Sequence, residues 1–345
     1  MNGIKDMPWL CNVELIKTTK LITLTTMNDD QKSPLVSIVV PSYNQGEFIK
    51  QTIDSILAQD YAPIQIIVVD GASTDNTVKI LKSYGDRRDL IWLSEPDRGV
   101  VDAVNKGFTL AQGKIIGIQS SDDLYLPKAI SKVINEFKRD DSIGLVYGDS
   151  IKIDAFGNEI FRAQTSQFSI RNMLLAKTWI PQSAAFFRRE LIDICGGWNE
   201  EISYVADTDL WLRIAFRTKV LKVNDFLGQH RAHENQRDKQ ALKISRDYCK
   251  MIDYSDDIAS ASKEIKKAAK ASKYLIKVRY NQTGQHWISA WNLLNAGLID
   301  KSVMQPKRIF FYALELPIRS FLSSFKRKIT NFLSLNEISS NNPKL

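Results

Sequence analysis

The chain has 345 residues, 44% of them hydrophobic and 25% charged, a composition typical of a folded globular protein and not of a disordered one. Its three cysteines are scattered and form no CxxC pair, which argues against a cysteine-built metal site and suits a reducing compartment. No apolar run approaches the ~20 residues that a membrane-spanning helix needs, and the N-terminus lacks a continuous apolar signal core.

The charge is distributed unevenly along the chain. From Ala241 onward there are 18 Lys/Arg and 8 Asp/Glu, a net +10, whereas residues 1–240 hold 29 and 31, a net −2, and the sum restores the formal +8. The basicity therefore lies in the C-terminal third, which predicts contact with an anionic surface there.

Residues 1–33 show little periodicity and are interpreted as a poorly ordered leader. Met27 stands just before the first convincing strand, so Met1 and Met27 are both candidate starts. From Leu35 the pattern alternates between strand and helix, which predicts parallel strands joined by right-handed crossovers. The predicted strands are 36–40, 64–69, 90–93 and 114–119, and the predicted helices are 47–59, one ending near Gly85, and one running to Gln112.

Polar residues follow the carboxyl ends of all four predicted strands. They are Asn44, Asp70, Asp97 and the adjacent pair Asp122 and Asp123. Ligands of open α/β sheets bind at that edge, so four such clusters predict a binding site. A dinucleotide-binding fold is the competing α/β interpretation, but residues 41–46 lack the GxGxxG that it requires.

The second half breaks the alternation. It predicts strands at 144–149, 150–161 (with a turn at 156–158) and 182–187, then a helix from Val205 to Ile214. Asp207 and Asp209 lie at the N-terminal end of that helix, where negative charge is favoured. This half is interpreted as an acceptor side that accompanies a nucleotide side.

Eight sequence blocks carry a family resemblance. In chain order they are VSIVVPSYNQGEFI, IIVVDGASTDNTV, SEPDRGVVDAVNKGF, GIQSSDDLYLP, VYGDS, PQSAAFFRRELI, GGWNEEI and ADTDLWLRIA. Over residues 35–233 the chain resembles family-two inverting glycosyltransferases with the GT-A fold. The SEPDxG and DGAST variants are similar to those of the branch that builds bacterial O-antigen and other surface polysaccharides.

The resemblance implies an α/β fold, a Rossmann-like mixed and mostly parallel sheet flanked by helices. It implies a GT-A domain over 34–238, with a nucleotide-binding half (34–125) and an acceptor half (126–238). Beyond it, the charge and periodicity of the tail predict a basic helical extension over 239–345. The donor would be a nucleotide-sugar, with UDP-sugars favoured.

Several residues match the family's nucleotide-side positions. The resemblance assigns base and ribose contacts to Pro41, Tyr43, Asn44 and Asp70, and further nucleotide contacts to Asp97, Asn105 and Ser121. The family's arginine before its N-x-G block is replaced here by Val104, and Arg98 or Lys106 would substitute at the phosphates. Strand-end packing is the alternative role for Tyr43, and a solvated surface position is the alternative for Lys106.

Asp122 and Asp123 match the end of the family's DxD-type motif, in which Ser120 replaces the first Asp. Carboxylate oxygens suit Mg²⁺ or Mn²⁺, whose coordination is usually completed by waters and substrate phosphates. The resemblance therefore implies a divalent cation that stabilises the departing nucleoside diphosphate, with Asp122 also on the donor side. The alternative is a solvated turn with a helix-capping Asp.

Asp207 matches the family's catalytic base, in a block usually written ED and here reading Ala206-Asp207. One direct displacement inverts the anomeric centre and needs one base. Helix N-terminal charge balance is the alternative role, and is favoured for Asp209. Weaker assignments to acceptor or diphosphate contacts are Gln182, Trp211, Arg231 and His233.

The tail is predicted to be helical and basic. One helix is predicted over 256–280 and a second over 285–295. Residues 318–332 then place six apolar side chains on one helical stripe, which predicts an interfacial helix on anionic lipid over 305–333. A helix packed back on the domain is the alternative, and nucleic acid is disfavoured because no binding motif accompanies the charge.

The resemblance implies sugar transfer to a saccharide or lipid-linked saccharide in bacterial surface polysaccharide synthesis. The protein would be cytoplasmic and peripheral on the inner face of the plasma membrane. A sugar-phosphate nucleotidyltransferase is one rival, but residues 41–46 lack its Gly-rich basic loop. A catalytically inactive module that organises a polysaccharide assembly complex is the other, favoured by the departures at Ser120 and Ala206.

Overall fold

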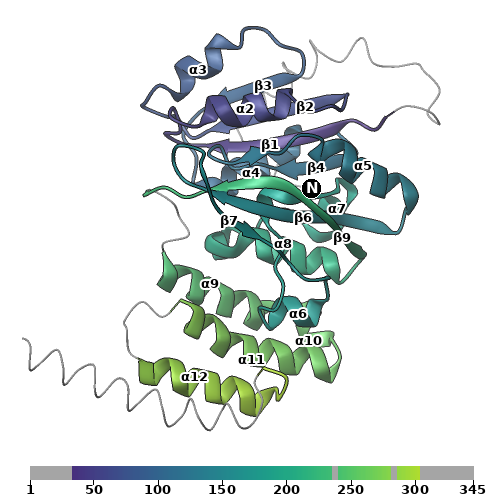
Figure 1. The fold of residues 1–345 in the computed structure, drawn as a ribbon, viewed down its shortest axis with the longest axis vertical. Helices are drawn as coiled ribbons and strands as arrows, with labels where there is room; N and C mark the ends of the chain where they lie inside the picture. Colours follow the sequence, from purple (N-terminus) through teal and green to yellow (C-terminus); the bar gives the residue numbers. More distant parts are fainter. Residues whose placement is uncertain (1–32, 235–239, 281–285, 304–345) are drawn as a thin grey trace, which may run out of the picture. The chain divides into compact units, whose positions relative to one another are not determined.

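The computed structural model describes residues 33–234, 240–280 and 286–303 (Figure 1). These residues form two compact units. Unit 1 contains residues 33–139, 182–197 and 227–230, and unit 2 contains residues 140–181, 198–226 and the described residues from 231 onward. Each unit is thus assembled from separate stretches of sequence.

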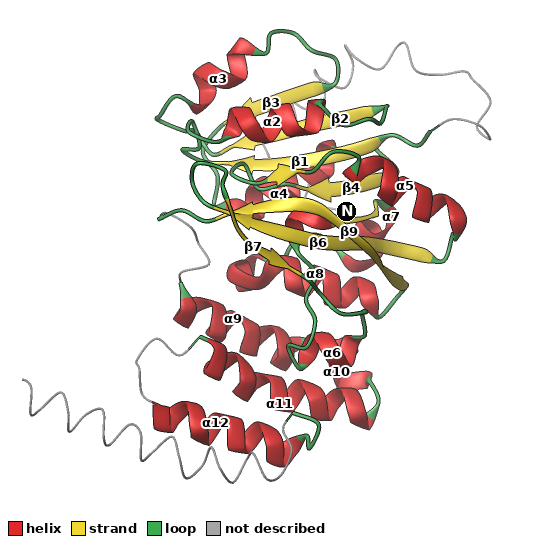
Figure 2. Cartoon of the chain, viewed as in Figure 1, coloured by secondary structure: helices red, strands yellow, loops and turns green. Residues whose placement is uncertain are grey.

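The sheet of unit 1 contains the four predicted parallel strands. They are β1 (Val36–Ser42), β2 (Ile64–Asp70), β3 (Leu90–Ser94) and β4 (Ile115–Ile118), in the order β3-β2-β1-β4 (Figure 2). The strand β8 (Ala185–Arg188) pairs antiparallel with β4. The short β5 (Leu124–Tyr125) pairs antiparallel with residues 228–229 of β9 (Lys219–Arg231). The predicted alternation and the parallel strands are confirmed.

Helices of unit 1 bury apolar stripes against this sheet. They are α2 (Ile49–Leu57), α3 (Thr77–Ser83), α4 (Val100–Leu110), α5 (Ala129–Arg139) and α7 (Glu190–Cys195). Helix α4 packs on β1 and β2, and it approaches so closely that a Cβ on Gly107 would lie 2.3 Å from Cγ1 of Val39. This close packing of α4 on the sheet supports the strands whose carboxyl ends carry the predicted site residues.

Unit 2 combines strands with helices. Strand β6 (Ile143–Ile153) forms an antiparallel hairpin with β7 (Glu159–Ala163). Helix α6 (Ile170–Leu174), the 3₁₀ helix η3 (Glu200–Val205) and α8 (Ala206–Ala215) precede four further helices in the described part of the chain. These four are α9 (Ala241–Tyr254), α10 (Asp256–Ser260), α11 (Lys263–Arg279) and α12 (His286–Ile299).

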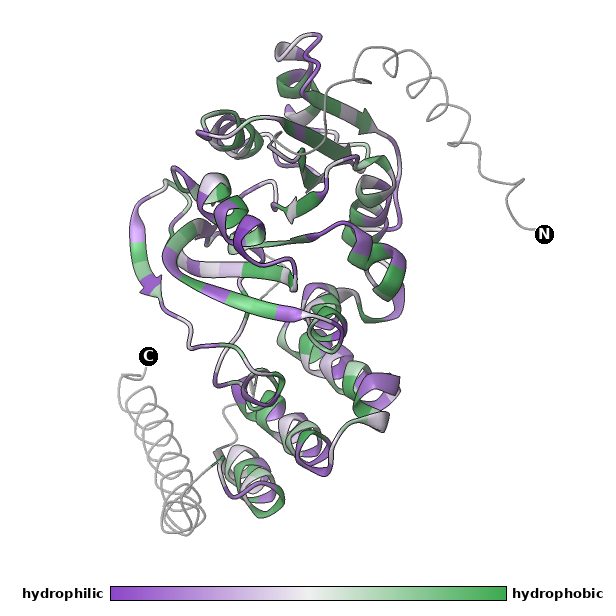
Figure 3. Ribbon diagram, turned by 90° about the vertical axis from the view of Figure 1, so that its right-hand side faces the viewer, coloured by the Kyte–Doolittle hydropathy of each residue, from purple (hydrophilic) through white to green (hydrophobic). Residues whose placement is uncertain are grey.

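One apolar cluster joins the C-terminal helices to the rest of unit 2. Leu174 of α6, Val205 of η3 and Leu212 of α8 share it with Met251 of α9 and Ala268 of α11. The helices carry both hydrophilic and hydrophobic residues along their length (Figure 3), because one side faces this core and the other faces water. The described part of the predicted extension is thus packed into the same core as α6 and α8.

The structure differs from the predicted elements in three places. Strand β9 was not predicted because its burial does not alternate cleanly along the strand. Helix α9 was not predicted, and the single helix predicted over 256–280 is two helices, because Ser262 caps a new start by accepting a hydrogen bond from the Ile265 N–H. The segment predicted as a strand at 182–187 begins with a 3₁₀ turn, η2 (Gln182–Ala184).

Within the described ranges, no helix is both long enough and apolar enough to span a membrane. The predicted leader up to residue 32, both candidate starts, and the predicted lipid-binding helix over 305–333 lie outside the described residues.

Candidate functional site

The loops that follow β1 and β2 are tied to each other. The backbone N–H of Asn44 donates to Oγ of Ser73 at 2.7 Å, and the N–H of Thr74 donates to Oδ1 of Asn44 at 2.9 Å. Asn44 and Ala72 both have left-handed backbones, with φ of 52° and 61°. Asparagine tolerates this conformation better than alanine does, so the strain in this turn is concentrated at Ala72.

Asp70 ends β2 and is fully buried. Its carboxylate accepts from the N–H of Ser73 at 2.9 Å, from Oγ of Ser73 at 2.5 Å, and from Oγ of Ser94 at 2.6 Å. Three of about four acceptor positions are therefore used inside the protein. Asp70 holds the loops after β2 and β3 in place, and its direct contact with a base or ribose stays a prediction.

The other predicted nucleotide-side residues differ in exposure. Tyr43 is 59% exposed and offers a ring face to a ligand, whereas Pro41 is buried inside β1 opposite Val69. Asp97 accepts from the N–H of Gly99 at 2.8 Å and lies against Gly71, where a Cβ would sit 2.7 Å from its Oδ2. The ends of β1, β2 and β3 are therefore brought together as predicted.

The two cations proposed to replace the family's arginine are paired with acids. Lys106 lies 2.8 Å from Oε1 of Glu95 and 3.3 Å from Oδ2 of Asp102, and Arg98 lies 3.2 Å from Oδ1 of Asp102. Burial lowers the pKa of Lys106, but the contacts with Glu95 and Asp102 outweigh it and the net shift is upward. Both cations are thus held near the strand ends, and their contact with phosphate stays a prediction.

The acidic pair lies in a loop fixed from several elements. The hydroxyl of Thr52 on α2 donates to the Ser121 carbonyl at 2.9 Å, and Nε2 of Gln182 donates to Oγ of Ser120 at 3.1 Å. Asp123 is 3% exposed, while Asp122 is half-buried. The structure therefore places Gln182 beside the acidic loop.

His230 also contacts this loop. Its Nδ1 lies 3.3 Å from Oδ2 of Asp123, and its side chain is partly exposed. The contact joins the end of β9 to the loop after β4. Asp123 is buried and Asp122 is half-buried, so Asp122 is the more accessible of the two carboxylates.

The donor atoms at this loop fit a divalent cation that shares its coordination with a ligand. Among the residues that the structure describes, no cluster of three or more His, Cys, Asp or Glu side chains is arranged to hold a metal alone. Mg²⁺ is commonly bound by one or two carboxylates, with waters and substrate phosphates completing the octahedron. Asp122 and Asp123 supply two carboxylates, so they suit a cation whose remaining ligands are waters and the phosphates of a bound diphosphate.

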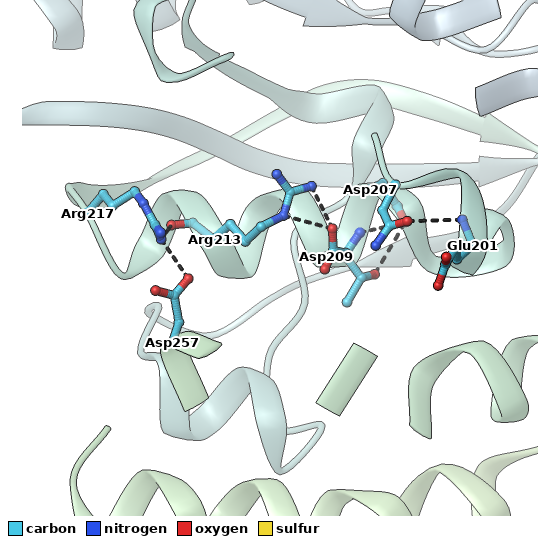
Figure 4. Close-up of polar contacts among 8 residues, drawn as sticks. Glu201, Asp207, Asp209, Arg213, Arg217 and Asp257 are labelled. Carbon is cyan, nitrogen blue, oxygen red and sulfur yellow. Dashed lines mark hydrogen bonds and ion pairs between the residues drawn. The ribbon is translucent and has the colours of Figure 1, made fainter. Parts of the chain in front are cut away.

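Asp207 lies in the first turn of α8, in unit 2 (Figure 4). Its Oδ1 accepts from the backbone N–H of Thr208 at 2.7 Å, and its side chain is half-buried. The preceding turn is fixed by Asn199, whose Oδ1 accepts from the N–H of Glu201 at 3.0 Å. The N-terminal end of α8 therefore presents a carboxylate where the helix favours negative charge.

Asp209 behaves differently from Asp207. It forms an ion pair with Arg213, with the shorter contact at 2.5 Å (Figure 4). Burial raises the pKa of Asp209, and the nearby Arg213 guanidinium opposes this without reversing it. Arg217, in the turn that follows α8, pairs with Asp257 of α10 at 2.6 Å. The ion pair with Arg213 gives Asp209 a structural role, whereas helix N-terminal charge balance, the role expected for it, stays a prediction.

Two weaker assignments are corrected by burial. Trp211 is only 1% exposed and packs in the core, so it cannot contact an acceptor or a diphosphate in this conformation. Arg231 is fully buried, and its Nη1 donates to the carbonyls of Asp154 and Ala155 at 3.3 and 2.9 Å. It fixes the β6–β7 turn. His233 is half-buried, and its assignment stays a prediction.

The sequence predicted acceptor or diphosphate contacts for Arg231 and His233 and gave no role to His230. Successive side chains of a strand point to opposite faces, so in β9 the side chains of His230 and Arg231 diverge. Recognising residues 219–231 as a strand would have separated them, but the burial of β9 does not alternate cleanly.

Known proteins with similar sequences indicate the family of this chain. A family model described as "Glycosyl transferase family 2" matches residues 37–195. An uncharacterized glycosyltransferase of Rickettsia typhi is 31% identical over 229 residues, which cover 64% of this chain and 71% of that relative. The chain belongs to glycosyltransferase family 2. This glycosyltransferase is also 30% identical over 186 residues to the chondroitin synthase of Escherichia coli, covering 54% of the chain and 27% of the synthase.

Solved structures confirm the predicted GT-A fold. The S. aureus TarS 1–349 structure in complex with UDP-GlcNAc matches with a TM-score of 0.56 at 16% identity, covering 78% of this chain and 82% of that one. The mannosyltransferase PcManGT from Pyrobaculum calidifontis, in complex with GDP-Man and Mn²⁺, matches with a TM-score of 0.57 at 19% identity, covering 90% and 94%. At these identities the likeness concerns the fold.

Proposed function

We propose that this glycosyltransferase moves a sugar, with inversion, from a nucleotide-sugar to a saccharide or lipid-linked saccharide. The observation that carries the donor assignment is the linked set of strand ends, in which Asn44, Ser73, Asp70 and Ser94 form one hydrogen-bonded group. The exposed ring of Tyr43 beside this group suits a nucleotide base. UDP is the favoured nucleotide, in keeping with the UDP-GlcNAc complex of TarS.

Asp122 and Asp123 are the proposed ligands of Mg²⁺ or Mn²⁺. The bound cation would supply charge neutralisation for the nucleoside diphosphate as it departs. His230 would hold Asp123 in orientation through the 3.3 Å contact. The Mn²⁺ in the mannosyltransferase complex supports this assignment.

Asp207 is the proposed general base. It would accept the proton of the acceptor hydroxyl as that oxygen attacks the anomeric carbon from the face opposite the diphosphate. A diphosphate leaves as a stable anion, so the leaving group needs no protonating acid. A positioned base of this kind typically contributes 10²–10⁴-fold to the rate, on the order of 3–5 kcal/mol.

A role in bacterial surface polysaccharide synthesis, O-antigen included, is part of the proposal. It is supported by the chondroitin synthase relatives and by the sequence variants at 94–99 and 70–74. We place the protein in the cytoplasm, peripheral on the inner face of the plasma membrane. The apolar and basic pattern of residues 318–332 supports this placement.

A thermal-shift screen of nucleotide-sugars, with and without Mn²⁺, tests the donor and the metal together. A ligand at 100 times its Kd stabilises the folded state by about 2.7 kcal/mol. The shift should require Mn²⁺ and should disappear in Asp122→Asn, while the exposed control Asp86→Asn keeps it. An Mn²⁺-independent shift in the parent would remove the metal from the proposal. Donor binding without turnover against any acceptor would favour the inactive assembly module.

A further inference from the structure

Helix α11 carries an unusual arrangement of charge. It contains the basic residues Lys263, Lys266, Lys267, Lys270, Lys273, Lys277 and Arg279 and one acid, Glu264. At 100° per residue, the six lysines fall within an arc of about 120°. The opposite side of the helix, which includes Ala268 and Ser272, is buried in the core of unit 2. The lysines thus form a single outward stripe.

Most of this stripe is not neutralised. In the described part of the chain, Lys263, Lys266, Lys267 and Lys270 have no acidic partner, whereas Lys273 pairs with Asp253 of α9 at 2.6 Å. Lysines three and four apart on a helix repel each other and destabilise the helix. The stripe contains several such pairs, so it opposes the stability of its own helix.

Helix α9 extends this surface. The Lys273–Asp253 ion pair joins the outward sides of the two helices. The outward side of α9 carries Lys243, Arg246 and Lys250, and it also exposes Leu242 and Tyr254, each 74% accessible. Cations flanked by exposed apolar and aromatic side chains are typical of surfaces that lie on the headgroup region of a bilayer. A soluble polyanion would engage the cations and leave the apolar side chains in water.

We propose that the outward side of α9 and α11 is a docking surface for an anionic membrane. The lysine stripe would meet the negative headgroups, while Leu242 and Tyr254 would enter the interface. The surface lies in described residues and is separate from the interfacial helix that the sequence predicts over 305–333. It does not depend on the identity of the donor sugar or on the catalytic base.

Co-sedimentation of the full chain with vesicles tests this surface. Vesicles of pure phosphatidylcholine are compared with vesicles containing phosphatidylglycerol. The variant replaces four unpaired lysines by glutamine: Lys263→Gln, Lys266→Gln, Lys267→Gln and Lys270→Gln. The matched control removes the same charge from exposed positions of unit 1: Lys79→Gln, Lys82→Gln, Lys114→Gln and Lys138→Gln.

The parent and the control should bind the anionic vesicles, and the α11 variant should bind them at least about 50-fold more weakly, since each lysine near a charged membrane contributes about fivefold. The α11 variant should also melt at or above the parent temperature, because like-charge repulsion is removed. Leu242→Gln should weaken vesicle binding. It should leave retention on a chondroitin sulfate column unchanged, because that polyanion offers no apolar phase for the leucine to enter.

Equal vesicle binding by the α11 variant and the parent would overturn the proposal. Parent binding to chondroitin sulfate with no binding to anionic vesicles would also overturn it and would assign the surface to a polyanionic glycan. A loss of binding in the unit 1 control equal to that in the α11 variant would show dependence on net charge alone.

Discussion

Nδ1 of His230 lies 3.3 Å from Oδ2 of Asp123, across 107 positions of sequence. This contact brings the end of β9 to the loop that holds the acidic pair. The hydroxyl of Thr52 on α2 holds the same loop through the Ser121 carbonyl. The acidic loop is therefore held by contacts from two other elements, β9 and α2.

His230→Ala should loosen Asp123 without unfolding the protein, because the histidine is partly exposed. We expect the Mn²⁺-dependent thermal shift with a bound nucleotide to fall, with apparent Mn²⁺ affinity reduced by about 10–100-fold, as is typical when a residue that orients a metal ligand is lost. Asp86→Asn, at an exposed position of unit 1, is the control and should keep the full shift. An unchanged shift in His230→Ala would show that the histidine does not orient Asp123.

Asp207→Asn should lower the transfer rate by 10²–10⁴-fold while leaving nucleotide binding unchanged, because the amide cannot accept the acceptor proton. Asp209→Asn is the contrast, because its carboxylate pairs with Arg213. That variant should lose about 1–3 kcal/mol of stability and retain turnover. Turnover assays and urea unfolding of both variants separate the two roles. Full activity in Asp207→Asn would exclude Asp207 as the base.

Gly107→Ala should destabilise the protein, because the new Cβ would meet Cγ1 of Val39 at 2.3 Å. Overpacking of this kind costs about 1–3 kcal/mol. Val39→Ala alone leaves a small cavity, and the double variant should recover part of both losses. A denaturant double-mutant cycle measures the coupling. Strict additivity would show that the two side chains do not meet.

Ala72→Gly should raise stability by about 1 kcal/mol, since its φ of 61° is strained for alanine and free for glycine. Ala103→Gly, inside α4, should change stability in the opposite direction by at least a similar amount. Thermal unfolding of the two variants gives the comparison. A loss of stability in Ala72→Gly would mean that the extra conformational entropy of glycine in the unfolded state outweighs the relieved backbone strain.

The ion pair between Arg171 and Asp300, at 2.6 Å, predicts a dependence of stability on pH. Burial acts to raise the pKa of Asp300, but the Ser302 contacts and Arg171 lower it below the usual 3.8. With a depressed folded pKa, the stabilisation is present above about pH 4 and is lost as pH falls through that lower value.

Asp300→Asn should therefore cost about 1–3 kcal/mol at pH 7 and much less at pH 2 to 3. Urea unfolding across this range measures the convergence of the parent and variant curves. Parallel curves would place the acid sensitivity in other carboxylates.

The strands of the nucleotide-binding half were predictable because each one has a clear signal in its own stretch of sequence. The runs at 36–40 and 64–69 are apolar, bounded by turn residues, and long enough for buried parallel strands. The polar residues at their ends follow from the topology alone, since parallel strands present their carboxyl ends at one edge. Asn44, Asp70 and Asp97 could therefore be placed near each other without a structure.

The role of each polar residue was harder to predict because hydrogen-bond partners come from distant loops. Ser73 and Ser94 fill most of the acceptor capacity of Asp70, and neither partner follows from a sequence period. Trp211 and Arg231 look like ligand-binding residues by type. Burial decides their role, and burial is set by packing partners that lie elsewhere in the chain.

The two compact units are interleaved along the chain. It passes from one to the other after residues 139, 181, 197, 226 and 230, and the last two passages lie within β9. No single cut separates the two units, because a cut after residue 139, for example, leaves residues 182–197 and 227–230 of unit 1 with unit 2. Exchange of donor or acceptor preference between related enzymes by domain shuffling would thus require several junctions, including two inside one strand. Substitutions within a single loop cross none of these junctions and leave both units intact.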